Sequence, residues 1–284
     1  MNSSWTTTCL AAALGVLVVA CQVAPPPTPP LEGEVEIIIA TGLPVTSEIL
    51  GKTRRVNVYL PFSYEQRDRR WPVVYLIDGG VEQDFFPVAG FGALATLSGQ
   101  YEEFIVVGVQ TEERTYELTT PSEVAYDLKL IPRNGGADDF RRFVTDEVMP
   151  LIDARYRTTG ETAVLGESLA AFFIMDIFLR APETFDHYIA VSPSLWWEDK
   201  ALSLAAAEYL QADDFPVDRS LFLTVADEVD IIESIEPLVT ALEEHAPESL
   251  TWWFDPMPEE HHNTIYHPAT LNALRLIFGE TSGE

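Results

Sequence analysis

Cysteine is nearly absent from this sequence. Only Cys9 and Cys21 occur among the 284 residues, and Cys9 lies in an N-terminal segment that we expect to be removed. The mature chain then holds at most one cysteine, so an internal disulfide is excluded even where an oxidising compartment would permit one. A cysteine nucleophile and a metal site built from thiolates are excluded for the same reason.

Basic side chains are also scarce. Lysine and arginine number 17 against 45 aspartates and glutamates, which gives a formal net charge of −28. Nucleic acids and anionic lipid headgroups are bound largely through cationic side chains, so we exclude nucleic acid as a partner and disfavour electrostatic docking on anionic membranes. The remaining composition, 47% hydrophobic and 22% charged, excludes a mostly disordered chain.

The N-terminus has the composition of an export signal. Residues 1–30 contain no charged side chain, and the apolar run at 9–20 is shorter than the ~20 residues that a transmembrane helix needs. The run ends in Val-Val-Ala-Cys at 18–21, which resembles a bacterial lipobox. This resemblance implies a signal peptide over residues 1–20, lipidation of Cys21, and a periplasmic or outer-membrane lipoprotein. Ordinary signal cleavage nearby, with Cys21 a bystander, is the alternative.

A proline-rich segment and then alternating strands and helices follow. Residues 21–33 predict a semi-rigid extended tether, because proline fixes φ. Apolar and β-branched runs predict strands at 35–39, 56–60, 73–77, 104–109, 162–165, 188–191, 221–225 and 250–254. Apolar residues near helical spacing predict helices over 140–151, 170–179, 238–242 and 271–278.

This alternation predicts an α/β fold in a single domain over residues 34–280. We expect a mostly parallel sheet with helices on both faces, and an antiparallel edge formed by the first two strands. The stretch 111–136 has no clean period and contains prolines and glycines. Long irregular segments inside compact domains are often functional, so we expect a functional loop there.

The most informative motif surrounds Ser168. Gly-Glu-Ser-Leu-Ala at 166–170 follows a predicted strand and precedes an apolar helix, which is the context of a nucleophile elbow. The sharp turn needs small neighbours, because bulky ones clash, and Ala170 stands where glycine is usual. A serine that merely caps the helix is the alternative interpretation. We predict that Ser168 is a nucleophile.

A serine nucleophile needs a base, because its hydroxyl is weakly nucleophilic at neutral pH. His261, His262 and His267 lie after the last predicted strand, where a hydrolase base belongs. His267 precedes a proline and is typical of a helix start. The local pattern alone does not separate His261 from His262.

The remaining parts of such a site are an acid and an oxyanion hole. The acid that orients the imidazole is expected after a strand between nucleophile and base, and we favour Glu228, with Asp227 and Asp230 as alternatives. Two backbone N–H groups must face the developing oxyanion. We predict Leu169, directly after the nucleophile, and Gly80, which follows the strand at 73–77; an ordinary glycine turn is the alternative for Gly80.

Four stretches carry a family resemblance. They are Tyr-Leu-Ile-Asp-Gly at 75–79, Arg-Thr-Tyr-Glu-Leu-Thr at 114–119, Phe-Asp-His-Tyr-Ile-Ala-Val-Ser-Pro-Ser-Leu-Trp-Trp at 185–197 and His-Asn-Thr-Ile at 262–265. The sequence resembles the putative esterase family of α/β-hydrolases, which includes enterochelin-type siderophore esterases and esterase D. The resemblance implies the α/β-hydrolase fold and selects His262, since 262–265 matches the family's His-x-Ser/Thr-aliphatic pattern. The family often has histidine before the nucleophile, where this chain has Glu167.

Together these features predict a serine hydrolase that cleaves a small-molecule carboxylic ester through an acyl-enzyme. Trp196 and Trp197 follow a predicted strand end and are expected to wall the substrate pocket, with core packing as the alternative. No metal is predicted, because the segment 259–262 lacks His-Glu-x-x-His spacing, and no cofactor is required. A catalytically silent binding module, suggested by Glu167 and Ala170, and transfer of the acyl group to another acceptor are the alternative functions.

Overall fold

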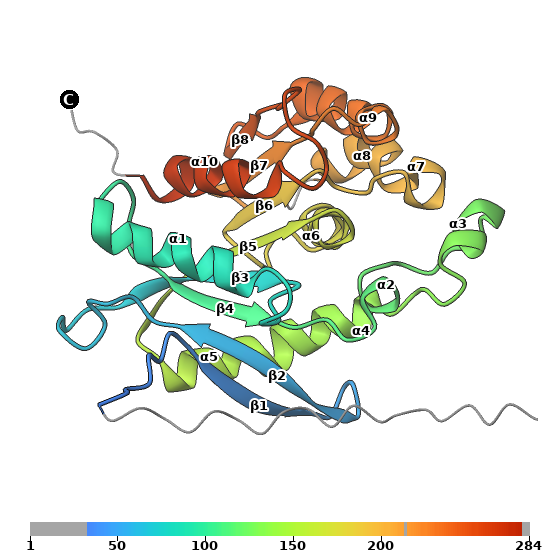
Figure 1. Cartoon of the computed structure of the whole chain (residues 1–284). Helices are drawn as coiled ribbons and strands as arrows, with labels where there is room; N and C mark the ends of the chain where they lie inside the picture. The colour runs from blue at the N-terminus through green and yellow to red at the C-terminus, as the bar shows by residue number, and fades with distance from the viewer. Residues whose placement is uncertain (1–32, 213–214, 280–284) are drawn as a thin grey trace, which may run out of the picture. The chain divides into compact units, whose positions relative to one another are not determined.

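Eight strands form one mixed sheet in the computed structural model, which describes residues 33–212 and 215–279 (Figure 1). The strands are β1 (Thr41–Ser47), β2 (Lys52–Tyr59), β3 (Trp71–Ile77), β4 (Ile105–Val109), β5 (Thr158–Glu167), β6 (His187–Val191), β7 (Arg219–Thr224) and β8 (Leu250–Phe254). Their order is β1-β2-β4-β3-β5-β6-β7-β8. The pairs β1–β2 and β2–β4 are antiparallel and the others are parallel, so the predicted, mostly parallel sheet is confirmed.

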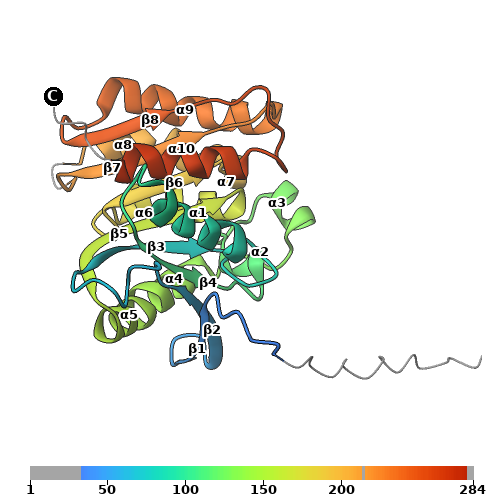
Figure 2. The ribbon, with the colours of Figure 1, turned by 60° about the vertical axis from the view of Figure 1, so that its left-hand side comes forward.

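Helices cover both faces of this sheet, as predicted. They are α1 (Phe85–Ser98), α2 (Arg114–Glu117), α3 (Ala125–Leu130), α4 (Ala137–Arg142), the π-helical segment η1 (Phe143–Val148), α5 (Met149–Arg155), α6 (Leu169–Arg180), α7 (Trp197–Leu204), α8 (Ala206–Leu210), α9 (Val229–His245) and α10 (Tyr266–Phe278). Figures 1 and 2 show α1 and α10 together on one face and the run from α4 to α6 on the other.

The period of two along the strands builds a separate core on each face. In β3, Tyr75 and Ile77 pack into the larger core with residues of α6 and α9. Val74 and Leu76, which alternate with them, pack into the second core with residues of α1 and α10. Because both faces are covered, the central strands are buried along their whole length, which explains their continuous apolar sequence.

The predicted first strand is wrong. Residues 34–40 form neither helix nor strand, and the edge strand is β1 at Thr41–Ser47. The turn at 48–51 reverses the chain so that Ser47 pairs with Lys52 and Thr41 with Val58. This register places β1, and not the apolar run at 35–39, against β2. The antiparallel character of the edge is as expected.

The sheet directs several loops toward one edge. In β3 to β8 the strands are parallel, so the residues that follow each of them meet at the same carboxyl edge. Neighbours β3 and β5 send their connections to opposite sides of the sheet, and ligands of open α/β sheets bind at such a switch point. Among the helices of the described residues, none has the length and apolarity needed to cross a bilayer.

Candidate active site

Ser168 occupies a strained turn between β5 and α6. Its backbone angles are φ 62° and ψ −118°, a conformation that side chains with a β-carbon rarely adopt and that costs on the order of 1–3 kcal/mol. The Ser168 N–H donates to the Val191 carbonyl (2.9 Å), and the Ser194 N–H donates to the Ser168 carbonyl (3.1 Å). The end of β6 and the residues after it therefore hold the serine in this conformation.

Close packing explains the small residues around the turn. A β-carbon on Gly166 would lie 2.7 Å from the β-carbon of Ala170 and 3.1 Å from Cδ1 of Ile174. Helix α6 thus rests directly on the end of β5, and only glycine fits at position 166. The alanine at the fifth position of the motif is compatible with the turn.

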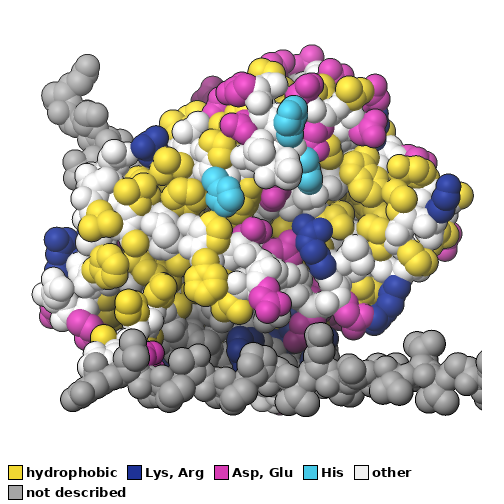
Figure 3. Space-filling model, viewed as in Figure 1, with side chains coloured by type: hydrophobic (Ala, Val, Ile, Leu, Met, Phe, Trp, Pro, Cys, Tyr) yellow, Lys and Arg dark blue, Asp and Glu magenta, His cyan; other side chains and the backbone are white. Residues whose placement is uncertain are grey.

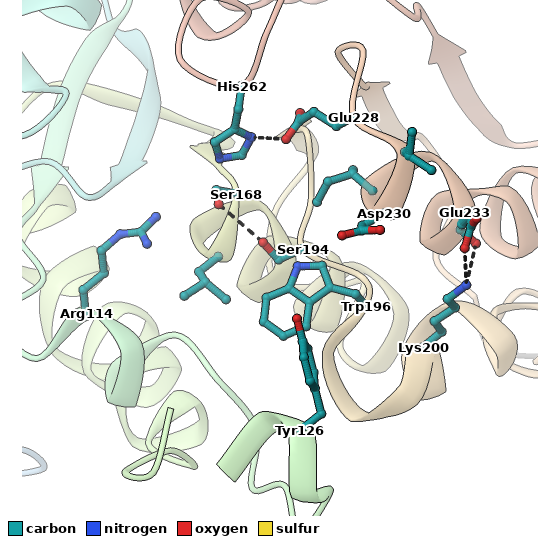
Figure 4. Close-up of a pocket in the computed structure, with 13 residues that line it drawn as sticks. Arg114, Tyr126, Ser168, Ser194, Trp196, Lys200, Glu228, Asp230, Glu233 and His262 are labelled. Carbon is teal, nitrogen blue, oxygen red and sulfur yellow. Dashed lines mark hydrogen bonds and ion pairs between the residues drawn. The ribbon is translucent and has the colours of Figure 1, made fainter. Parts of the chain in front are cut away.

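The Ser168 side chain opens into a cavity of about 730 Å³ (Figure 4). Several loops of the carboxyl edge contribute to its wall, including Arg114 of α2, Tyr126 of α3, Trp196 after β6, Asp230 of α9 and His262 after β8. The Ser168 hydroxyl lies 3.4 Å from the hydroxyl of Ser194. The irregular stretch 111–136, expected to be functional, supplies two of these residues.

His262 lies beside Glu228 on the wall of this cavity. Its Nδ1 is 2.7 Å from Oε1 of Glu228, although the ring N–H is not aligned for a linear hydrogen bond. The Ser192 hydroxyl donates to Oε2 of Glu228 (2.9 Å) and accepts from the Ala226 N–H (3.2 Å), which fixes the carboxylate. Figure 4 shows the second ring nitrogen of His262 facing Ser168. The structure thus brings the predicted nucleophile, base and acid to one place.

The other candidates lie elsewhere or make no such contact. His261 is exposed, and its backbone N–H bonds to Thr264. Asp227 is exposed and lines a different cavity, behind α9. Asp230 faces the cavity of Ser168. In the described part of the chain, neither aspartate pairs with an imidazole.

One predicted oxyanion donor is not available. The Leu169 N–H is the first of α6, so no carbonyl of the helix accepts from it. The Gly80 N–H, by contrast, donates to Oε1 of Gln83 (2.9 Å), and Gln83 in turn donates to Thr111. The Gly80 prediction is therefore wrong: the glycine belongs to an ordinary turn closed by a side chain.

Arg114 brings a cation to the site, a role that the sequence pattern alone does not assign. Its Nε donates to Oδ2 of Asp78 (2.6 Å), and its Nη2 donates to the Glu167 carbonyl (3.4 Å). Asp78 is buried, has a φ of 60° and also accepts from the Thr111 hydroxyl. These contacts aim the guanidinium into the cavity beside Ser168 (Figure 4). The family-like stretch at 114–119 begins at this residue, but its role was not assigned from the sequence.

The two tryptophans have different surroundings. Trp196 lines the cavity, where its ring meets Tyr126 edge-on with centroids 6.3 Å apart. Trp197 is fully buried, and its Nε1–H donates to the Thr120 carbonyl (3.1 Å). The structure therefore places Trp196, and not Trp197, on the pocket wall. Adjacent residues at the start of α7 point in different directions, so only one ring reaches the cavity.

Comparison with known proteins identifies the family of the chain. The family model described as "Putative esterase" matches residues 47–227, which include the turn at Ser168 but end before Glu228 and His262. That match spans more than half of the chain. The chain belongs to the putative esterase family.

Individual relatives agree with the family. A siderophore enterobactin esterase of Emericella nidulans is 30% identical over 115 residues, which are 37% of this chain and 38% of that protein. An endo-1,4-beta-xylanase/feruloyl esterase of Xylanibacter ruminicola is 28% identical over 176 residues, 58% of this chain and 23% of that protein. The chain thus covers less than two thirds of these relatives' length.

Solved structures of the α/β-hydrolase type share the fold. An IroE-like serine hydrolase from Shewanella oneidensis superposes with a TM-score of 0.75 at 24% identity, covering 84% of this chain and 80% of that one. The BES protein from Bacillus cereus gives 0.75 at 23% identity, with 86% and 98% covered. The expected α/β-hydrolase fold is confirmed.

Glu167, next to Ser168, is a carboxyl group with a perturbed pKa. It is partly buried, and its Oε1 has no hydrogen-bond partner. Burial, together with the nearby Asp84 and Glu228 carboxylates, raises its pKa to about 8, although the Arg114 charge acts in the opposite direction. Glu167 is therefore largely protonated at neutral pH, which keeps an additional negative charge away from Ser168.

This pKa predicts how Glu167 affects stability. Between the ordinary carboxyl pKa and about 8, the folded state holds a proton that the unfolded state has released, so Glu167 makes folding less favourable as the pH rises. In Glu167→Gln this dependence is absent. The melting temperature of the variant relative to wild type should rise between pH 5 and pH 9, measured by circular dichroism. Glu243→Gln, the same change on the exposed surface of α9, should show no such rise, and an equal profile for both variants would contradict the assignment.

Proposed function

We propose that the protein hydrolyses carboxylic esters through an acyl-enzyme formed on Ser168. The observation that carries this proposal is the position of the His262 imidazole, which has Glu228 at 2.7 Å on one side and faces the strained Ser168 on the other. A base held by a carboxylate next to a serine that lies at a sharp turn and lines a cavity is the arrangement of serine hydrolases.

The residues take the following roles in this proposal. The Ser168 hydroxyl attacks the ester carbonyl and passes its proton to the second ring nitrogen of His262, while Glu228 stabilises the imidazolium that forms. The Leu169 N–H and the Arg114 guanidinium stabilise the negative charge on the carbonyl oxygen. His262 then gives the proton to the leaving alcohol, and the carbonyl re-forms as the acyl-enzyme.

The second half of the reaction uses the same groups. A water molecule replaces the alcohol, His262 accepts its proton, and the resulting hydroxide attacks the acyl carbonyl. Collapse of this second intermediate releases the carboxylic acid and returns the proton to Ser168. Two relatives are named as a siderophore esterase and a feruloyl esterase. These names support ester hydrolysis as the reaction class.

We also propose that the protein is exported and held at a membrane by a lipid on Cys21. The signal peptide at 1–20, Cys21 and all but the last residue of the tether at 21–33 lie outside the described residues. The support is the apolar run and the lipobox-like ending in the sequence.

Removal of the nucleophile should abolish turnover. Ser168→Ala should lower kcat for a p-nitrophenyl ester by at least about 10³-fold, because no other group forms the acyl-enzyme. The control is Ser194→Ala, whose hydroxyl is 3.4 Å away; loss of one neutral hydrogen bond should cost no more than about tenfold. Undiminished turnover in Ser168→Ala would contradict the mechanism, as would a larger loss in Ser194→Ala.

The acid should be identified by a matched pair of variants. Glu228→Gln keeps the shape of the side chain but removes the charge beside the imidazole, so kcat should fall by about 10²-fold or more. Asp227→Asn makes the same change one residue away, at a side chain that faces another cavity, and should stay within about twofold of wild type. Stopped-assay kinetics on one ester at fixed pH measure both. A larger loss in Asp227→Asn would refute Glu228 as the acid.

Lipidation should depend on Cys21 alone. When the full chain is expressed in a bacterium with radiolabelled palmitate, the label should enter the wild type and be absent from Cys21→Ser. Cys9→Ser, the matched change inside the signal segment, should keep the label. Equal labelling of wild type and Cys21→Ser would exclude this anchor.

A further inference from the structure

The cavity beside Ser168 has two chemically different sides. Arg114 lies on one side, and its charge is paired with Asp78. Trp196, Tyr126 and Asp230 lie on the other side (Figure 4). When the ester carbonyl lies between Ser168 and Arg114, the rest of the substrate therefore contacts the wall formed by Trp196, Tyr126 and Asp230.

Aromatic rings form one part of that wall. Tyr126 and Trp196 meet at an interplanar angle of 81°, and the indole of Trp196 also packs edge-on against the buried Trp197, with centroids 5.9 Å apart. The second contact anchors Trp196, whereas Tyr126 on the short helix α3 is 61% exposed. Indole and phenol faces attract cations through their quadrupole, most strongly in the case of tryptophan.

Asp230 supplies an uncompensated negative charge on the same wall. It lies in the first turn of α9, is exposed to the cavity, and makes no ion pair or hydrogen bond with another described residue. The neighbouring cation, Lys200, is already held by the Glu233 carboxylate (3.7 Å) and the Glu233 carbonyl (3.2 Å). Glu228 is likewise engaged by His262. Among the described residues on this side of the cavity, Asp230 is therefore the charged side chain that has no ion-pair partner.

The surrounding field has the same sign. The chain carries a net charge of −28, and acidic side chains gather over α9 at the top of the face seen in Figure 3. Such a field raises the local concentration of cationic ligands and lowers that of anionic ones. A carboxylate combined with tryptophan and tyrosine rings is the chemistry that recognises an alkylammonium group.

We propose that Trp196, Tyr126 and Asp230 form a subsite for an ammonium group, so that the preferred substrate is an ester carrying a cationic alkylammonium substituent. This inference rests on the proposed ester hydrolysis at Ser168. Two simpler interpretations compete with it. In the first, Asp230 serves only to stabilise the N-terminus of α9, as carboxylates in a first helical turn do. In the second, the two rings bind a neutral apolar group.

Pairs of esters that differ only in charge test the proposal. One pair is choline butyrate and 3,3-dimethylbutyl butyrate, in which a carbon replaces the quaternary nitrogen of the alcohol. The other is the p-nitrophenyl ester of trimethylammonio-butyrate and its carbon isostere, which place the same groups on the acyl side. In at least one pair, kcat/KM should be about tenfold higher for the cation at low salt, and this preference should shrink as salt is added.

Variants assign the preference to residues. Asp230→Asn should reduce the cation-to-isostere ratio to about twofold or less, and Trp196→Leu should also lower it. Glu236→Gln, the same loss of charge on α9 but outside this cavity, should keep the wild-type ratio. A ratio near one in wild type for both pairs, or an Asp230→Asn ratio equal to that of wild type, overturns the subsite.

A binding measurement separates the subsite from the reaction. Tetramethylammonium should bind the Ser168→Ala protein with a quench of tryptophan fluorescence, and Asp230→Asn in that background should weaken this binding by about tenfold. If no ester is hydrolysed but tetramethylammonium binds with this dependence on Asp230, the proposed function fails and the subsite stands. If neutral esters are hydrolysed and tetramethylammonium binds both proteins equally, the subsite fails and the proposed function stands.

Discussion

The backbone of Ser168 is the constraint on which the rest of the site depends. A non-glycine residue with a φ of 62° persists only where its surroundings determine it, and here β6 contributes a hydrogen bond on one side while α6 packs tightly on the other. The close approach of Gly166 to Ala170 lets α6 pack directly on the end of β5. In this conformation the hydroxyl points into the cavity at the end of β5. The other functional groups lie on loops that follow the neighbouring parallel strands.

Much of this arrangement was predictable from local sequence. The buried strands have long apolar runs because both of their faces are covered, and each chemically informative residue follows such a strand. Ser168 follows β5, Glu228 lies shortly after β7 and His262 follows β8. Since parallel strands end at one edge, predicting the strands also predicts that these residues meet. The choice of Glu228 over its neighbours was a preference, and the contact to His262 now gives it a geometric reason.

The features that sequence did not predict depend on long-range packing. Arg114 is the first residue of the short helix α2, and its direction is set by Asp78, 36 residues earlier. Gly80 looked like an oxyanion donor because it follows β3, but the side chain of Gln83 takes its N–H. The two adjacent tryptophans point in different directions at the start of α7, so Trp196 lines the cavity and Trp197 is buried. The hydrophobic pattern predicted a strand at 35–39, but the segment that pairs with β2 across the hairpin turn is Thr41–Ser47.

The most direct test of the account is to locate the covalent bond that it requires. The wild-type protein would be reacted with a fluorophosphonate, digested, and analysed by tandem mass spectrometry. A single phosphonyl group on Ser168 is the predicted result, because this hydroxyl lies at the strained turn and faces His262. Modification of Ser194 in its place, or an unmodified protein under conditions that label other serine hydrolases, would contradict the central claim.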